Sequence, residues 1–208
     1  MTLLRAVLSP VPPTERSPLV ALLLHGFGSH EHDLVGLAGW LPPRLPWASL
    51  RAPLEIGYGG AAWFPLSPDG AMDQASIDAA TDAVWAWVDA RLGEEARIVP
   101  LGFSQGGLMA LQLLRTRPAR VVAPVVLAGF VPPGAQAADA ALAKSRPPVF
   151  WGRGDADPVI WPDAIARTRA FLAVHASAET RVYPGLGHSI TEDELDDART
   201  FLAAHLPG

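Results

Sequence analysis

The feature that most constrains the fold is an alternation of short, continuous apolar runs with longer amphipathic segments. The runs, the last two of them weaker, are residues 19–25, 97–103, 121–128, 148–151, 180–183, 2–8 and 48–52. Strands buried on both faces have this continuous apolar character, and they occur in parallel sheets covered by helices. The pattern therefore predicts a single α/β domain, residues 1–208, with a mostly parallel central sheet and helices on both faces.

Helical periodicity fills several of the segments between these runs. Apolar residues recur at three- and four-residue steps over residues 77–92, and residues 105–117 form an apolar stretch that a proline ends. Residues 162–174 are also predicted to be helical. A last helix is predicted from Thr191, because Thr191 and Glu194 have the spacing of a capping box.

Composition narrows the class of protein. Half of the 208 residues are hydrophobic and 18% are charged, which is typical of a globular chain. The net charge is −5 and the Lys and Arg residues form no run, so we expect no nucleic-acid partner. The chain has no cysteine, which excludes disulfides, cysteine metal sites and a cysteine nucleophile.

Two features of the sequence bear on where the protein is expected to be located. The N-terminus has no basic stretch followed by a long apolar segment, so we expect no secretory signal. The longest unbroken apolar run, Leu19–Leu24, is far too short to span a bilayer. We therefore expect a cytoplasmic protein with no integral membrane segment.

One motif places a serine between a strong strand and a strong helix. The stretch Gly102-Phe103-Ser104-Gln105-Gly106 fits G-x-S-x-G. An abrupt strand-to-helix turn puts the serine at its tip, and the glycines leave room for tight packing. The helix N-terminus adds free N–H groups and the positive end of a dipole. The motif in this context predicts Ser104 to be a nucleophile, with an ordinary glycine-rich turn as the alternative.

A serine hydroxyl needs a base, and the base needs an acid that orients it. When a serine is held in such a turn, the acid and then the histidine follow it in the chain. His188 lies in a glycine-rich loop between the last predicted strand and the last helix, where a base is needed. His205 and His175 lie near helix ends, where a solvated or capping histidine is common. We therefore predict His188 as the base.

Two carboxylates compete for the role of the orienting acid. Asp155 and Asp157 both follow the predicted strand at residues 148–151. Asp157 precedes a proline, which favours an extended backbone that could direct its side chain toward the histidine loop. Asp155 could instead close the turn by accepting hydrogen bonds from backbone N–H groups. We favour Asp157.

A developing oxyanion needs two fixed N–H donors. One is predicted at Gln105, which follows the serine, and the other at Phe27, in the loop after an earlier strand. Glycines on both sides of Phe27 allow a close approach to a substrate. His25 precedes the serine and is interpreted as a buried residue that ties this loop down.

Together these motifs resemble those of small α/β-hydrolases in the carboxylesterase, lysophospholipase and acyl-protein thioesterase family. The matching stretches follow the family's order over nearly the whole chain: Leu24-His25-Gly26-Phe27-Gly28, Asp33-Leu34, Gly59-Gly60-Ala61-Ala62-Trp63-Phe64, Gly102-Phe103-Ser104-Gln105-Gly106-Gly107, Gly154-Asp155-Ala156-Asp157-Pro158 and Gly187-His188. The block around Ser104 is much more specific than the general pattern.

The resemblance implies an α/β-hydrolase fold, and the chain has no long insertion that would form a large cap domain. It implies a serine carboxylic-ester hydrolase that cleaves esters or thioesters through an acyl-enzyme intermediate. It assigns the triad and the oxyanion hole to Ser104, Asp157, His188, Phe27 and Gln105. Trp63 and Phe64 would belong to a substrate-binding loop near the acyl site, with plain core packing as the alternative.

The resemblance also bears on cofactors and partners. It implies no metal and no cofactor, and a small-molecule or lipid ester or thioester as the substrate. It leaves a homodimer open. Arg153 and Pro65 depart from the residues that many relatives carry, a histidine and an aspartate, so loop details and substrate preference stay open.

Two other functions remain as alternatives. A non-catalytic ligand-binding protein could have the same fold, because a fold does not dictate a function. A hydrolase of another acyl bond, such as an amide or a lactone, could use the same residues. Covalent labelling by a fluorophosphonate distinguishes a serine hydrolase from the ligand-binding protein. Rates on a panel of esters, thioesters and amides distinguish an ester hydrolase from a hydrolase of another acyl bond.

Overall fold

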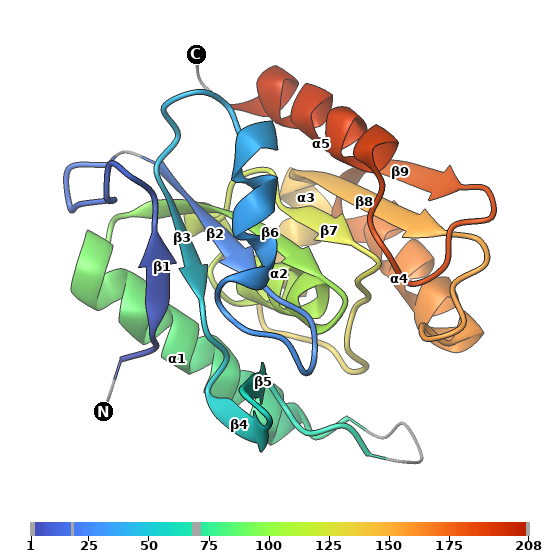
Figure 1. Cartoon of the computed structure of the whole chain (residues 1–208). Coiled ribbons are helices and arrows are strands. Elements are labelled where there is room, and N and C mark those ends of the chain that lie inside the picture. Colours follow the sequence, from blue (N-terminus) through green and yellow to red (C-terminus); the bar gives the residue numbers. More distant parts are fainter. Residues whose placement is uncertain (1–2, 18, 68–71, 207–208) are drawn as a thin grey trace.

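The computed structural model describes residues 3–17, 19–67 and 72–206. Its main sheet has the strand order β1-β3-β2-β6-β7-β8-β9, and β1 alone is antiparallel to its neighbour (Figure 1). The strands of this sheet are β1 (Ala6–Leu8), β2 (Leu19–Leu24), β3 (Trp47–Leu50), β6 (Arg97–Phe103), β7 (Val125–Leu127), β8 (Pro148–Gly154) and β9 (Ser177–Tyr183). The predicted mostly parallel sheet is confirmed.

Helices cover both faces of the sheet, as predicted. They are η1 (Asp33–Trp40), α1 (Gln74–Leu92), α2 (Gln105–Thr116), η2 (Pro118–Arg120), α3 (Asp139–Ser145), α4 (Pro162–His175) and α5 (Glu192–His205), where η marks a 3-10 helix. No helix within the described ranges combines the length and the apolar character needed to cross a membrane.

The central strand β2 shows why its sequence is apolar without a break. All six of its residues are buried. Its alternate side chains point to opposite faces, as in any strand, so Val20, Leu22 and Leu24 pack in one core with α1, α2 and α4. Leu19, Ala21 and Leu23 pack in a second core with η1 and α5. Both faces of β2 are therefore buried, and no polar position is left in it.

Several expected strands differ in length from the structure. Of residues 121–128 only Val125–Leu127 form β7, because Ala123 has a φ of 43° that turns the chain, while Val121 makes an isolated bridge to Ile98. At one edge of the sheet, β9 begins at Ser177, three residues earlier than predicted. Most β9 side chains are exposed or half-buried, so this edge strand lacks the apolar signal of the central strands. The predicted strand 2–8 is shorter in the structure, where β1 covers only Ala6–Leu8, and residue 2 lies outside the described residues. The predicted strand 148–151 is longer, because β8 continues to Gly154.

A short hairpin was not predicted. Its strands, β4 (Leu54–Gly57) and β5 (Gly60–Ala62), pair antiparallel outside the main sheet. The backbone of Ala61 also exchanges two hydrogen bonds with the loop after β2, Gly28 N to Ala61 O at 3.0 Å and Ala61 N to Ser29 O at 2.8 Å. The hairpin therefore braces the loop that carries Phe27.

Candidate active site

Ser104 lies at a tight turn between β6 and α2. Its φ of 56° and ψ of −116° are strained for a residue with a side chain. A Cβ at Gly102 would overlap the backbone carbonyl of Gly106, and a Cβ at Gly106 would overlap the carbonyl of Leu24. The Ser104 N–H donates to the carbonyl of Leu127 at 2.9 Å, which joins the turn to the next strand. Only glycine fits two positions before and two positions after the serine, as the motif predicts.

His188 and Asp157 lie close to this serine. His188 Nε2 is 2.8 Å from Ser104 Oγ, and His188 Nδ1 is 2.7 Å from Asp157 Oδ2. The three residues follow β6, β8 and β9, whose carboxyl ends meet at one edge of the sheet. Ligands of open α/β sheets bind at that edge. In the neutral histidine that fits these contacts, Nδ1–H donates to Asp157 and Nε2 accepts from the serine hydroxyl.

The two competing carboxylates make different contacts. The Asp157 side chain is only 3% exposed, and its other oxygen accepts from the N–H groups of Val159 at 2.8 Å and Ile160 at 3.2 Å. Asp155 Oδ1 instead accepts from the N–H of Gly185 at 2.6 Å. Asp155 therefore ties the turn after β8 to the loop that leads to His188, and Asp157 is the carboxylate beside the histidine.

The two predicted oxyanion donors come from the helix after Ser104 and from the loop after β2. Gln105 is the first residue of α2, so its N–H has no acceptor within the helix. Phe27 lies in the loop after β2, and none of the described residues accepts a hydrogen bond from its N–H. Gln105 and Phe27 both line the cavity that contains Ser104.

The side chain of Gln105 has a function that the sequence did not indicate. Its Oε1 accepts from the N–H of Trp63 at 2.8 Å, and its Nε2 donates to the carbonyl of Phe64 at 2.7 Å. Trp63 Nε1 in turn donates to the carbonyl of His25 at 2.9 Å. Gln105 is thus a buried clamp between the helix after Ser104 and the chain after β5. The signal that the sequence offers for it is a glutamine directly after the serine.

His25 is a structural residue of the loop, in agreement with its interpretation. The ring is fully buried. Nδ1 lies 2.7 Å from the carbonyl of Gly26, and the N–H of Ala52 donates to Nε2 at 3.1 Å. Burial lowers the pKa of His25, because the charged ring would lose its hydration. The neutral ring therefore joins the loop after β2 to the segment after β3.

The cavity above Ser104 has a volume of about 560 Å³ and is lined mostly by apolar side chains. Phe64, Leu66 and Met72 line it from one segment, and Phe130 and Trp161 from others. Phe64 was predicted to bind substrate and contacts the cavity. Trp63 was predicted with it, and both rings are buried in the core, but Trp63 is not among the residues that line the cavity.

Two charged side chains near the site lie in unusual surroundings. The predicted capping box of α5 forms only in part. Thr191 Oγ1 accepts from the N–H of Glu194 at 3.3 Å, whereas the Glu194 carboxyl is fully buried and has no partner in the described part of the chain. Burial raises the pKa of Glu194 to about 7. Arg153 lies over the ring of Trp151, and burial lowers its pKa.

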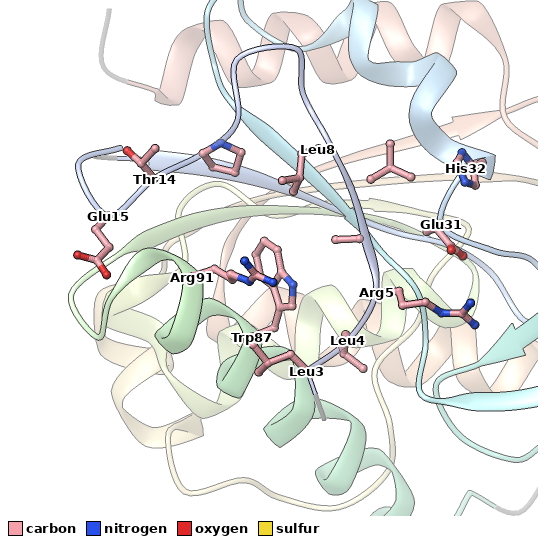
Figure 2. Close-up of a pocket in the computed structure, with 13 residues that line it drawn as sticks. Leu3, Leu4, Arg5, Leu8, Thr14, Glu15, Glu31, His32, Trp87 and Arg91 are labelled. Atoms are coloured by element: carbon pink, nitrogen blue, oxygen red, sulfur yellow. The ribbon is translucent and has the colours of Figure 1, made fainter. Parts of the chain in front are cut away.

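A larger hollow of about 830 Å³ lies along the edge strand β1, away from Ser104. Figure 2 shows its lining, which comes from the residues before β1, β1 itself, the loop after it, α1 and the segment after β2. Leu3, Leu4 and Trp87 belong to its apolar part (Figure 2). Neither the serine nor the histidine of the candidate site reaches it.

The family model described as phospholipase/carboxylesterase matches residues 8–206. The chain belongs to this family. Membership confirms the predicted recognition, the α/β-hydrolase fold class and the enzyme class, a serine carboxylic-ester hydrolase.

Individual proteins that are similar to this chain have names that agree with this family. A probable carboxylesterase of Oryza sativa is 29% identical over 82% of this chain and 67% of its own length. Acyl-protein thioesterase 1 of Cryptococcus neoformans is 26% identical over 92% of this chain and 94% of its own. The crystal structure of the Bacillus cereus carboxylesterase superposes with a TM-score of 0.80 at 23% identity, covering 97% of this chain and 94% of that one. At that identity, the superposition speaks for the fold alone.

Proposed function

We propose that the chain hydrolyses carboxylic esters or thioesters with Ser104 as nucleophile, His188 as general base and acid, and Asp157 as the orienting carboxylate. The hydrogen-bonded series from Ser104 Oγ through His188 to Asp157 Oδ2 carries the proposal. Both contacts are within the reach that proton transfer needs. The series ends in a mostly apolar cavity with room for a small ligand.

In the acylation step, Ser104 Oγ attacks the carbonyl carbon of the substrate while its proton passes to His188 Nε2. Asp157 stabilises the imidazolium that forms and holds Nδ1–H in place. When the tetrahedral intermediate collapses, the bond to the leaving alcohol or thiol breaks and His188 gives its proton to the leaving group. Ser104 is then esterified.

Deacylation repeats the same steps with water. His188 takes a proton from water, the hydroxide oxygen attacks the acyl carbon, and the carboxylic acid leaves as Ser104 Oγ recovers its proton. Both tetrahedral intermediates carry an oxyanion. The N–H groups of Phe27 and Gln105 would stabilise it, since each is a fixed donor in a site that is partly closed to water.

The substrate class follows from the cavity and from the relatives. Relatives are named carboxylesterase and acyl-protein thioesterase, so both oxygen and sulfur leaving groups are proposed. The aromatic and aliphatic lining near Ser104 fits an acyl chain, and Phe64 is the predicted binding residue that contacts the cavity. The side chain of Gln105 would hold the Phe64 backbone in position for such a chain.

The test is hydrolysis of p-nitrophenyl esters from acetate to palmitate by the wild-type protein and Ser104→Ala. We expect activity that depends on chain length and is lost in the variant. A fluorophosphonate should label the wild-type protein at Ser104 and leave the variant unlabelled. An enzyme that is neither active on esters nor labelled would support the alternative of a ligand-binding protein. Faster cleavage of amides or lactones than of esters would move the proposal to another acyl bond.

A further inference from the structure

One charged side chain of the Ser104 cavity plays no part in the proposed chemistry. Arg167, on α4, lines this cavity together with Ser104 and His188. Most of its surroundings there are apolar, including Phe130, Pro133 and Trp161. An arginine in an apolar wall loses hydration, so it is found there when its charge has a purpose or a partner.

The position of Arg167 is fixed by one end of its guanidinium group. Its Nε donates to the carbonyl of Val131 at 3.0 Å. Val131 is also hydrogen-bonded to Thr168, the residue after Arg167 on α4, because the Val131 N–H donates to Thr168 Oγ1 at 2.9 Å. The Nε bond uses one of the five N–H donors of an arginine. The head group is therefore held in place beside the cavity.

The terminal nitrogens of Arg167 have no acceptor within residues 3–17, 19–67 and 72–206, and no carboxylate there lies within ion-pair distance. Asp163, one turn earlier on α4, acts on the charge only through space. Burial lowers the pKa of Arg167, yet the group stays charged, since an arginine is not deprotonated in proteins. A fixed, partly desolvated and unneutralised guanidinium attracts an anion more strongly than one in water.

We propose that Arg167 binds a carboxylate or phosphate group of the substrate whose ester or thioester bond is cleaved at Ser104. The preferred substrate is then an ester that carries a negative charge on its acyl or alcohol part, and Arg167 determines this preference. The planar guanidinium suits both anions, because it can donate two parallel hydrogen bonds to either. This inference rests on the proposed function.

Asp163 allows a second test of the charge that an anionic substrate meets in this cavity. It lines the cavity, lies in the first turn of α4 and is exposed. Its negative charge opposes the binding of an anion that Arg167 attracts. Removing the charge of Asp163 should therefore strengthen the preference for an anionic substrate, whereas removing the charge of Arg167 should weaken it.

The experiment measures kcat/KM for matched pairs of esters. In one arm, mono-p-nitrophenyl glutarate is compared with p-nitrophenyl valerate, which has the same chain length without the carboxylate. In the other arm, glycerol phosphate butyrate is compared with glycerol monobutyrate. The proteins are wild type, Arg167→Gln, Arg167→Lys, Asp163→Asn and the control Arg169→Gln, an exposed arginine of α4 outside the Ser104 cavity.

The quantity of interest is the ratio of charged to neutral substrate. We expect Arg167→Gln to lower this ratio by about 10- to 100-fold in at least one arm, the range of a hydrogen bond to a charged group. Arg167→Lys should restore part of the ratio, Asp163→Asn should raise it, and Arg169→Gln should leave it unchanged. The arm that responds identifies the anion as an acyl carboxylate or a phosphate on the alcohol.

A different set of results overturns the inference. If Arg167→Gln lowers kcat/KM for both members of each pair by the same factor, the side chain only positions α4 through Val131. If Arg167→Gln changes none of these kcat/KM values, Arg167 binds no substrate anion. Failure of the proposed function is a separate result: Ser104→Ala would then still hydrolyse the neutral p-nitrophenyl valerate at the wild-type rate.

Discussion

The cavity at Ser104 and the hollow along β1 are both large enough for a small ligand, about 560 and 830 Å³, but they differ in what lines them. The cavity at Ser104 lies where the carboxyl ends of the parallel strands meet. Loops from three of these strands bring a hydroxyl, an imidazole and a carboxylate into hydrogen-bond contact there. The hollow follows the one antiparallel strand of the main sheet, at its edge.

The charges of the two places also differ. At the hollow, two of the charged side chains are in ion pairs, Arg5 with Glu55 at 2.6 Å and Glu31 with Arg51 at 2.9 Å, and two others, Glu15 and Arg91, are exposed. At the cavity, Arg167 lacks an ion-pair partner in the described part of the chain. His188 is hydrogen-bonded through one ring nitrogen to Ser104 and through the other to Asp157. Volume alone therefore does not indicate a reactive site. Converging polar groups in an apolar wall do.

The largest effect on activity is expected from a substitution of the nucleophile in the cavity at Ser104. Ser104→Ala should lower kcat on p-nitrophenyl butyrate by about a million-fold, the loss seen when a triad loses its serine. Ser189→Ala is the control, since Ser189 is an exposed serine next to His188. It should retain kcat within about threefold, which is a change of less than 1 kcal/mol in the barrier. Steady-state rates with active-site titration measure both. A mutant that kept even a tenth of the activity would end the assignment of Ser104.

The next contrast is between the two aspartates after β8. Asp157→Asn should lower kcat by about ten thousand-fold, because an amide favours the wrong tautomer of His188. Asp155→Asn keeps an oxygen that can accept from Gly185, so it should cost less than tenfold. Circular dichroism checks that both variants are folded. Equal losses in the two variants would show that the loop geometry matters more than the carboxylate beside the histidine.

A smaller effect is expected from the buried carboxyl of Glu194. Burial raises its pKa from 4.5 to about 7, so the folded state holds the proton more tightly than the unfolded chain. Stability should therefore fall as pH rises from about 4.5 to 7 and stay low above that, with a total cost of about 3 kcal/mol.

Urea unfolding of the wild-type protein, Glu194→Gln and Glu192→Gln at several pH values measures this cost. Glu194→Gln should lose this pH dependence. Glu192→Gln, an exposed change in the same helical turn, should keep it. A wild-type stability that does not change between pH 5 and pH 8, the window set by about 4.5 and 7, would mean that the carboxyl is hydrated when folded.

The smallest effect is expected in the hollow along β1. Arg91 is exposed and lines this hollow (Figure 2). Arg91→Gln should change the free energy of unfolding by less than about 0.5 kcal/mol, as for most surface substitutions, and leave ester hydrolysis unaltered. Thermal unfolding and p-nitrophenyl butyrate rates measure both quantities. A tenfold loss of activity would reveal coupling between the hollow and the cavity at Ser104.

Much of the sheet was predictable because its central strands are buried on both faces. The apolar run at residues 97–103 has the same bounds as β6, and α2 and α4 end within one residue of their predicted ends. The hairpin β4–β5 was missed, since its residues are small or exposed and lack the alternation of a half-buried strand. It forms because Ala61 pairs with the loop after β2, a contact between segments about thirty residues apart.

The candidate site was predictable where a short stretch contains its own signal. Ser104 has glycines two positions away on each side, and His188 follows a glycine in the loop before the last helix. The surroundings of Gln105, Arg167 and Glu194 could not be predicted from the residues next to them in the sequence. Their environments come from the carbonyl of Phe64, the carbonyl of Val131 and the close approach of Gly152.

The sequence by itself determined the class of sheet and the strained turn that holds Ser104, because burial patterns and backbone strain depend on residues a few positions apart. The tertiary structure alone decided which aspartate faces His188, which aromatic residue faces the cavity and which charged side chains lose water. Those outcomes depend on how separate strands and helices pack, since a hydrogen bond or a lost hydration shell is set by neighbours in space.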